Sequence, residues 1–312
     1  MHPLYSVIIP CYNEEAVLRE THKRLMQVLS AMEGDYELIY VNDGSRDQTP
    51  QILRELAAAD SHVRALQFAK NAGHQMAVTA GLDYARGDAL VIIDADLQDP
   101  PELIPQMAEK WRAGAQVVFA QRRARAGESA FKKITASAYY KLLSWLTGGM
   151  IPRDTGDFRL VDKRVADVIR AMPEHDRFLR GMFAWVGFQQ EAVLYDRDKR
   201  YAGETHYTLK KMLKLAGDGI FSFSVKPLKA IAGLGLLLLA AAGITLLTLL
   251  ILLFCGVPGG LWWLAMLMTG LTGCVLAALG VLGEYVARIY DEARKRPLYI
   301  VAEAIGFPQD EC

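Results

Sequence analysis

Two long stretches without a charged residue constrain this chain more than any other feature. The first covers residues 230–254 and the second covers residues 261–283, with the short segment 255–260 between them. About 20 consecutive apolar residues are enough to cross the hydrocarbon core of a bilayer. A helix buried in a soluble core is rarely that long, so the sequence predicts a transmembrane hairpin with spans at about 230–254 and 261–283.

Basic residues flank the outer ends of the two stretches, whereas the segment between them is uncharged. Because positive charge favours the cytoplasmic side, we expect a multi-pass protein of the inner membrane with both termini in the cytoplasm. Glu284 and Arg288 lie one helical turn apart near the end of the second span and should form a pair. Residues 207–223 read as an amphipathic helix on the membrane surface, with a plain surface helix as the alternative. The flanking basic residues are Lys210, Lys211, Lys214, Lys226, Lys229, Arg288, Arg294, Lys295 and Arg296.

The predicted organisation has four parts. Residues 1–206 form a cytoplasmic α/β domain, 207–229 an interfacial amphipathic segment, 230–286 the transmembrane hairpin and 287–312 a cytoplasmic tail. No secretory signal pattern is visible at the start, and the cysteines lack the spacing of a disulfide framework or a zinc site. Lys and Arg number 35 against 35 Asp and Glu, and this balance excludes nucleic acid as the main partner.

Up to about residue 120, short β-rich runs alternate with stretches of helical spacing. This alternation predicts an α/β fold with a mostly parallel, doubly wound, Rossmann-like sheet. The predicted strands are 5–9, 37–41, 63–68, 89–93, 116–119, 158–161 and 188–195. The predicted helices are 15–32, 49–59, 75–85, 101–113, 129–146 and 177–186.

The predicted strand at 89–93 leads directly into Asp94 and Asp96. At the carboxyl end of a buried strand, these carboxylates lie where open α/β sheets bind ligands. Their oxygens suit a divalent cation that leaves most of its shell to phosphate and water. The same spacing taken alone is more often a surface turn. Asp99 is expected to cap the helix that follows Pro100.

Polar clusters also follow the first two predicted strands, at residues 10–15 and 41–47. Three clusters on one sheet edge outline a crevice. In it Asp43 can accept hydrogen bonds from a nucleobase, Asp94 can contact a ribose or a metal-bound water, and Asp96 can hold the metal. Asp-Gly-Ser at 43–45 is also a common turn, which is the structural alternative.

Several motifs together identify a family. They are P-C-Y-N-E-E at 10–15, V-N-D-G-S-R-D at 41–47, N-A-G-H-Q at 71–75 and D-A-D-L-Q-D-P-P-E at 94–102. With them the chain resembles the family 2 glycosyltransferases of the GT-A fold. G-D-F-R-L at 156–160, R-Y-A-G-E-T-H-Y at 200–207, S-F-S at 222–224 and V-L-G-E-Y-V-A-R-I-Y at 281–290 are similar to the bacterial polyprenyl-phosphate glycosyltransferases, relatives of dolichyl-phosphate mannose synthase.

This resemblance implies inverting transfer of one sugar from a nucleotide sugar, with UDP-glucose or another UDP-hexose preferred, to undecaprenyl phosphate. The lipid-linked sugar would serve modification of lipopolysaccharide or another envelope glycan. It also implies Mg²⁺ or Mn²⁺ on Asp96 and Asp94. Gly and Ala throughout both spans allow a homo-oligomer. The expected nucleotide-sugar-binding residues are Pro10, Tyr12, Glu14, Asp43, Asp94 and Gln98.

The acceptor phosphate calls for cations more than for a strong base, because a phosphate oxygen is already a nucleophile. Arg159 is expected to contact phosphate. Asp157 can act as a base, orient the acceptor or simply pair with Arg159. His74 and Gln75 open a helix and can contact the donor or cap the helix. Glu204 and His206 lie in a loop expected to close over the site. The expected acceptor-phosphate-binding residues are Arg122, Arg123, Lys132 and Arg200, with a solvated charge run as the alternative for the first three.

Two other functions compete with this one. A processive polysaccharide synthase on the same fold should carry a Gln-x-x-Arg-Trp element and several spans, which this sequence lacks. A catalytically silent scaffold could bind a nucleotide sugar or a partner protein. The presence of Asp94, Asp96, Asp157 and Arg159 argues against it.

Overall fold

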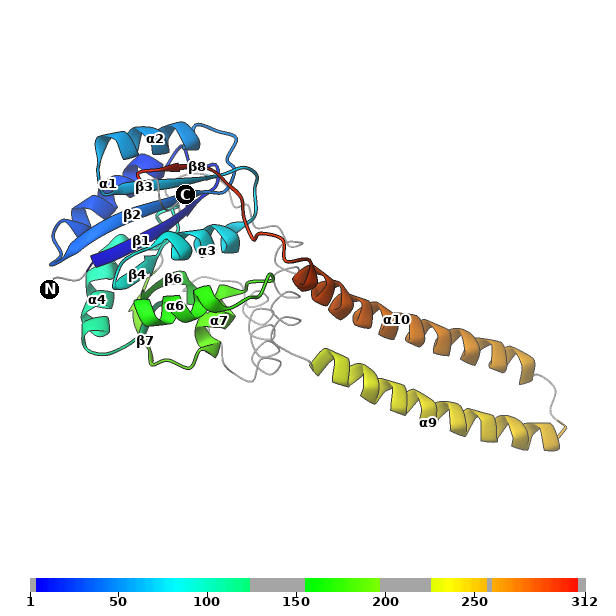
Figure 1. Ribbon diagram of the computed structural model, residues 1–312. Helices are drawn as coiled ribbons and strands as arrows, with labels where there is room; N and C mark the ends of the chain where they lie inside the picture. The colour runs from blue at the N-terminus through cyan, green and yellow to red at the C-terminus, as the bar shows by residue number, and fades with distance from the viewer. Residues whose placement is uncertain (1–3, 124–154, 197–225, 257–259, 308–312) are drawn as a thin grey trace. The chain divides into compact units, whose positions relative to one another are not determined.

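The computed structural model describes residues 4–123, 155–196, 226–256 and 260–307 of the 312 residues (Figure 1). The chain divides into two compact units, Met1–Leu215 with Pro297–Cys312 and Ala216–Arg296. The described strands all lie in the first unit, and two long helices lie in the second. Residues 297–307 therefore belong with the amino-terminal sheet, although they follow the two long helices in the sequence.

The first unit is built around one sheet with the strand order β7-β5-β6-β4-β1-β2-β3-β8. Strands β4, β1, β2 and β3 run parallel to one another, as alternating strands and helices predict. The strands are β1 Leu4–Cys11, β2 Asp35–Asn42, β3 Val63–Phe68, β4 Ala89–Ile92, β5 Val117–Arg122, β6 Thr155–Asp162, β7 Gln190–Tyr195 and β8 Val301–Ile305.

The sheet is mixed but mostly parallel, as predicted, because six of the eight described strands run in one direction and only β6 and β8 are reversed. β6 lies between β4 and β5 and runs antiparallel to both, and β8 runs antiparallel to β3. The alternation of apolar residues was enough to locate β6 but does not encode the direction in which a strand enters the sheet. Because β6 is reversed, its first residues lie at the edge of the sheet where its neighbours β4 and β5 end.

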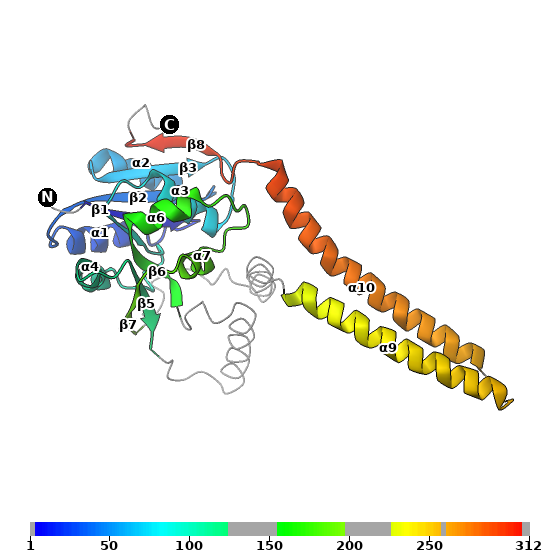
Figure 2. The ribbon, with the colours of Figure 1, turned by 60° about the horizontal axis from the view of Figure 1, so that its bottom comes forward.

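Helices cover both faces of the sheet (Figures 1 and 2). Successive side chains of a strand point to opposite faces. On one face, the side chains of Tyr5, Val7 and Ile9 pack with apolar residues of α1, α2 and α4. On the other face, Ile8 packs so close to Gly81 of α3 that a Cβ at Gly81 would overlap its side chain. The helices are α1 Leu18–Leu29, α2 Thr49–Ala59, α3 His74–Tyr84, α4 Ile104–Arg112 after the short 3₁₀ turn η1 Pro101–Leu103, α6 Lys163–Ala171 and α7 Leu179–Trp185.

Strand β8 completes the sheet at the β3 edge, and neither it nor α6 was predicted from the sequence. Arg54 of α2 donates two hydrogen bonds to Glu303 Oε2, at 2.7 and 3.2 Å. Just before the strand, the ring of Tyr299 stacks on Phe68 with a centroid distance of 5.2 Å. Residues 301–305, part of the predicted tail 287–312, thus form a strand of the α/β unit.

The second unit contains α9 Lys226–Phe254 and α10 Gly260–Arg294. Among the described residues, one helical segment, Trp263–Arg294, is long and apolar enough to cross a membrane, and Ala240–Leu252 is a shorter apolar segment. Arg288 Nη2 donates to Glu284 Oε1 at 3.2 Å, which confirms that predicted pair. The complete two-span hairpin stays a prediction.

Candidate active site

The polar residues predicted to form the site lie at one edge of the sheet, where the carboxyl ends of its parallel strands meet. β1, β2 and β4 end there, at Cys11, Asn42 and Ile92. The reversed strand β6 begins there. Its register pairs Arg159 with Ile92, so Asp157, two residues earlier, extends toward the residues that follow β4. The predicted crevice residues and Asp157 are therefore brought to the same edge.

The loops after β1 and β2 are joined by hydrogen bonds. The Asn13 N–H donates to Ser45 Oγ and the Arg46 N–H donates to Asn13 Oδ1, each at 2.9 Å. Asn13 has φ +56°, a left-handed conformation that Asn tolerates better than most residues. The neighbouring Tyr12 side chain is exposed at this edge. The donor contacts expected of Pro10, Tyr12 and Glu14 stay predictions.

Asp43 organises the loop that leads into α3. Its Oδ1 accepts the N–H of Ala72 at 2.6 Å, and its Oδ2 accepts the N–H of Gly73 and Nδ2 of Asn71, each at 2.9 Å. Burial raises the pKa of Asp43, although these backbone bonds and His74 oppose the rise. The nucleobase contact of Asp43 stays a prediction, and its carboxylate already links the second loop to the start of α3.

We expect Gly44→Ala to destabilise the first unit by about 2 kcal/mol or more, because strain in left-handed backbone and a steric clash add together. Gly44 has φ +65°, and a Cβ there would lie 2.6 Å from the Asn71 nitrogen, a backbone atom. Thermal unfolding of the purified protein measures the effect. Gly73→Ala is the matched control, since Gly73 has φ +99° but nothing within 4 Å of its Cβ position. Equal losses for both variants would contradict the role of the close approach.

Asp94 and Asp96 lie where the sequence placed them, directly after β4. Asp96 is buried and its Oδ1 accepts the Gln98 N–H at 3.1 Å. Asp94 is partly exposed, and its Oδ1 lies 3.8 Å from His74 Nε2. Burial and three neighbouring carboxylates raise the pKa of Asp94 to about 6, against the opposing charge of His74. The neighbouring carboxylates therefore disfavour the negative charge of Asp94.

The chemistry of these side chains fits a hard divalent cation. Carboxylate oxygens are the ligands that Mg²⁺ and Mn²⁺ prefer, and a cation beside Asp94 and Asp96 would relieve their mutual repulsion. Within the part of the chain that the structure describes, no group of three or more His, Cys, Asp or Glu side chains is arranged to hold a metal ion. A cation at this edge thus needs ligands from elsewhere, such as phosphate and water.

Asp157 lies between two basic side chains. Arg180 Nε and Nη2 donate to Asp157 Oδ1 and Oδ2 at 2.6 and 2.9 Å, and His74 Nε2 lies 3.2 Å from Oδ2. Burial opposes ionisation, but the charge of Arg180 and the bonds from both neighbours hold the pKa of Asp157 well below its usual range. Burial likewise opposes charge on His74, yet Asp157 and Asp94 raise its pKa to about 9. At neutral pH an ionised carboxylate therefore lies between two cations, which makes Asp157 a weak base.

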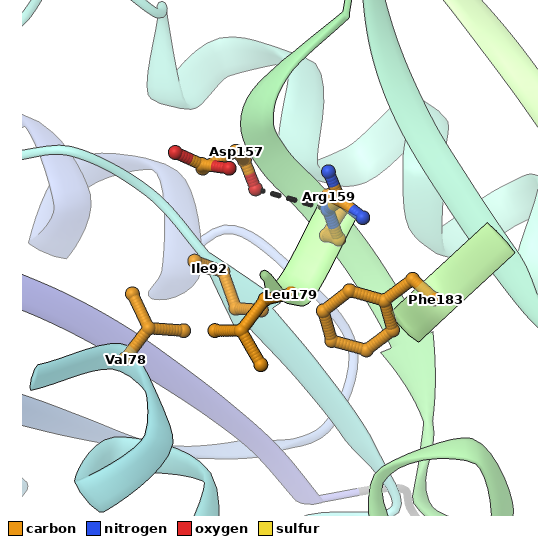
Figure 3. Close-up of a pocket in the computed structure, with 6 residues that line it drawn as sticks. All are labelled: Val78, Ile92, Asp157, Arg159, Leu179 and Phe183. Carbon is orange, nitrogen blue, oxygen red and sulfur yellow. Dashed lines mark hydrogen bonds between the residues drawn. The ribbon is translucent and has the colours of Figure 1, made fainter. Parts of the chain in front are cut away.

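Three elements bring this cluster together. His74 opens α3, as predicted, Asp157 lies at the start of β6, and Arg180 is in α7. The Leu179 N–H donates to Gln75 Oε1 at 2.9 Å, which joins the starts of α7 and α3. Figure 3 shows Asp157 and Arg159 beside apolar side chains that line a small pocket with them, namely Val78, Ile92, Leu179 and Phe183.

Arg159 is buried and supports the backbone of the edge. Its Nη2 donates to the Gly156 carbonyl oxygen at 2.9 Å, and its Nε donates to the Asp157 carbonyl oxygen at 3.2 Å. Its guanidinium carbon lies 4.7 Å from the ring centroid of Phe183. The carboxylate of Asp157 pairs with Arg180 and not with Arg159, which corrects that alternative. The predicted phosphate contact of Arg159 stays a prediction.

Arg122 and Arg123 follow one another at the same edge but have different surroundings. Arg122 Nε donates to Tyr195 Oη at 3.2 Å, whereas the Arg123 side chain is largely exposed and lies 3.3 Å from Asp196. Tyr195 also donates to Asp99. The cap residue of the turn η1 is Pro100 and not Asp99, and it makes no side-chain cap hydrogen bond, which corrects the capping role predicted for Asp99. The predicted residues Lys132, Arg200, Glu204 and His206, the helix 129–146 and residues 207–223 lie outside the described residues.

Sequence reasoning missed three residues at this edge, namely Arg180, Asp99 and Tyr195. Arg180 lies in a predicted helix without a motif, and Tyr195 is the last residue of a predicted strand. Asp99 belongs to a recognised motif but was assigned to a helix cap. One available signal was the carboxyl end of the strand predicted at 188–195, because polar residues at such ends tend to meet in α/β sheets.

The sequence model described as "Glycosyl transferase family 2" matches residues 6–170, more than half of the 312 residues. The chain belongs to this family. The protein is therefore a glycosyltransferase, and the matched region contains β1 to β6 with the three acidic residues Asp94, Asp96 and Asp157. The expected α/β fold of the GT-A type is confirmed, with a mixed sheet.

Relatives match the glycosyltransferase over nearly its full length. "Uncharacterized glycosyltransferase YkcC" of Bacillus subtilis (strain 168) is 50% identical over 98% of this chain and 95% of that protein. "Bactoprenol glucosyl transferase" of Shigella phage SfII is 38% identical over 96% of this chain and 97% of that protein. A crystal structure of glucosyl-3-phosphoglycerate synthase from Mycobacterium tuberculosis with Mn²⁺, UDP-glucose and phosphoglyceric acid is 22% identical, covers 71% of this chain and 78% of that one, and has a TM-score of 0.48. That likeness is too low for residue roles to pass to this chain.

Proposed function

We propose that the glycosyltransferase transfers one glucosyl group from UDP-glucose to polyprenyl phosphate, with inversion at the anomeric carbon. The observation that carries this proposal is the 38% identity to a protein named bactoprenol glucosyl transferase over 96% of the chain. The family 2 match ends at residue 170, whereas this similarity extends through the long apolar helices. Support for a lipid acceptor thus comes from a match over nearly the whole chain and not from the family match alone.

A lipid acceptor requires the enzyme to work at a membrane surface. We propose that α9 and α10 form the transmembrane hairpin, with the α/β unit and both termini on the cytoplasmic side of the inner membrane. The apolar segment Trp263–Arg294 and the basic residues outside the two apolar stretches support this arrangement. The segment 207–229 is proposed to lie on the same surface.

The donor is proposed to bind at the sheet edge, with its diphosphate beside Asp94 and Asp96. These two carboxylates would hold Mg²⁺ or Mn²⁺, which when bound supplies positive charge that offsets the negative charge growing on the leaving nucleotide. The Gln98 N–H, bonded to Asp96 Oδ1 at 3.1 Å, orients that carboxylate. Tyr12, exposed at the same edge, is the proposed contact for the nucleoside part of the donor.

The acceptor phosphate is an anion and a nucleophile at neutral pH, so the site has to orient it more than deprotonate it. Asp157 is held ionised by Arg180 and His74. This arrangement favours a role in which Asp157 fixes these two cations over a role as a general base. The phosphate would then approach a surface whose positive charge comes from Arg180, His74 and Arg122.

A lipid-extraction assay with the full-length purified enzyme tests the proposal. Radiolabelled UDP-glucose and undecaprenyl phosphate are incubated with the divalent metal, and organic-phase label is measured. We expect label there only when enzyme, metal and the phosphorylated lipid are all present, with undecaprenol as the matched acceptor control. Label in an insoluble polymer would indicate a processive synthase, and no transfer from any of a panel of UDP- and GDP-sugars would indicate a silent scaffold. The same panel identifies the sugar.

A further inference from the structure

A buried hydrogen-bond network holds Arg122 at the edge of the active site. Arg122 and Tyr195 are the last residues of β5 and β7 and face each other in the register of the two strands. Tyr195 Oη donates to Asp99 Oδ1 and accepts from Arg122 Nε at 3.2 Å. Asp99 is 1% exposed and Tyr195 is 4% exposed. Two buried side chains thus fix the guanidinium of a third.

The guanidinium of Arg122 lies across the backbone of β6 next to Asp157. A Cβ added to Gly156 would lie 3.1 Å from Arg122 Nη2 and 3.8 Å from Asp99 Oδ2. The absence of a side chain at Gly156 therefore lets the guanidinium pass close to the backbone. Gly156 directly precedes Asp157, and the charge of Arg180 acts on Arg122, so Arg122 lies near the cluster that contains Asp157 and Arg180.

Arg123, the next residue, occupies an ordinary surface position and serves as a comparison for Arg122. The Arg123 side chain is 60% exposed and lies 3.3 Å from Asp196, which is itself 77% exposed. Such exposed ion pairs contribute little to stability and do not hold a side chain in one position. The Arg122 side chain is 21% exposed, with its Nη2 3.9 Å from Asp99 Oδ1. A guanidinium that is held in place yet still reaches solvent can bind an oxyanion without first losing side-chain freedom.

The protonation of the network suits this task. Burial and the adjacent Asp99 raise the pKa of Tyr195 to about 12, even though Arg122 opposes the rise. The phenol therefore stays protonated and can donate to Asp99 while it accepts from Arg122. A planar guanidinium fixed through its Nε presents its remaining N–H groups in the geometry that suits phosphate.

We infer that Tyr195 and Asp99 are positioning residues that hold Arg122 for the phosphate group of the lipid acceptor. This inference rests on the proposed function and extends it to residues outside the predicted site. It assigns Arg122 to the acceptor and not to the donor diphosphate. Variants of this network distinguish the two assignments, because they should weaken binding of the lipid acceptor and not of the nucleotide sugar.

Steady-state kinetics of Tyr195→Phe test the inference. Loss of one hydrogen bond to a charged group is worth roughly a tenfold change in affinity, so we expect the KM for undecaprenyl phosphate to rise about 5- to 20-fold. The KM for UDP-glucose and the kcat should stay within about twofold of wild type. Arg122→Lys should raise the acceptor KM at least as much, and the double variant should be no worse than Arg122→Lys alone.

Tyr5→Phe is a matched control, because Tyr5 is also buried and its Oη accepts from Arg112 Nη2 at 2.9 Å. That pair lies at the amino end of β1, so both KM values should be unchanged. Gly156→Ala gives a second variant that leaves the network's chemistry intact but displaces the guanidinium, and it should also raise the acceptor KM. An unchanged acceptor KM in Tyr195→Phe, or a rise in the donor KM instead, overturns the inference. Absence of lipid-linked product with the wild-type enzyme would instead reject the proposed function itself.

Discussion

Asp96→Asn is expected to lower kcat about 100-fold or more, the scale reached when one preorganised charge-stabilising group is removed from an active site. Asp96 is buried directly after β4, and its Oδ1 is oriented by the Gln98 N–H. An amide is a poorer ligand for a hard cation than a carboxylate, so the leaving nucleotide would lose most of its charge compensation. Initial rates at saturating UDP-glucose and lipid acceptor measure the loss.

Asp88→Asn is the matched control for this substitution. Asp88 precedes β4 as Asp96 follows it, and Asp88 Oδ2 accepts the Leu4 N–H at 3.1 Å. It lies at the opposite edge of the sheet, so its replacement should leave kcat within about twofold, as surface substitutions usually do. Raising the Mg²⁺ or Mn²⁺ concentration should recover part of the Asp96→Asn rate. Full activity of Asp96→Asn, or of the wild type after exhaustive chelation, would remove the metal from the mechanism.

Asp157→Asn is expected to lower kcat about 100-fold as well, through the loss of the charge that holds two cations together. Arg180 donates two hydrogen bonds to this carboxylate, and His74 lies 3.2 Å from it. Without the negative charge, the guanidinium and the imidazolium repel each other and leave their positions. The kcat of the variant, measured with both substrates saturating, reports this loss.

A double-mutant cycle with Arg180→Gln separates positioning from general-base catalysis. If Asp157 acts by fixing Arg180, the double variant should be about as slow as the slower single variant, because the two residues form one unit. Losses that multiply would instead support an independent base. Asp162→Asn is the control, since Asp162 lies at the other end of β6 and accepts from Arg164 Nε at 2.8 Å. It should lower stability slightly and leave kcat nearly unchanged.

The sequence was sufficient to locate the acidic edge. Parallel strands bring their carboxyl ends to one side of a sheet, so Asp43, Asp94 and Asp96 could be placed together from strand positions alone. Helix α2 was predicted with its observed bounds, 49–59, because Pro50 favours a helix start at that point. These features depend on local pattern and on one general rule of α/β sheets.

The remaining features depend on how distant segments pack. Asp157 reaches the edge because β6 runs backwards, and nothing in its own residues determines that direction. Arg180 becomes the partner of Asp157 because α7 packs beside α3 through the bond between Leu179 and Gln75. Tyr195 and Asp99 meet across 96 positions of sequence. Side chains such as these can be proposed as polar residues from the sequence, but their partners follow only from the tertiary structure.

Strand β8 has a consequence for how the enzyme is made. Its residues, Val301–Ile305, leave the ribosome only after both long apolar helices. Until then, the outer edge of β3 in the nascent α/β unit has no neighbouring strand to pair with. A protein shortened before residue 226 would carry this open border permanently, with a tendency to associate through it. A shortened form without the two long helices would need residues 297–312 fused after the amino-terminal part, so that β8 can still pair with β3. Folding of the α/β unit and completion of translation are thereby coupled.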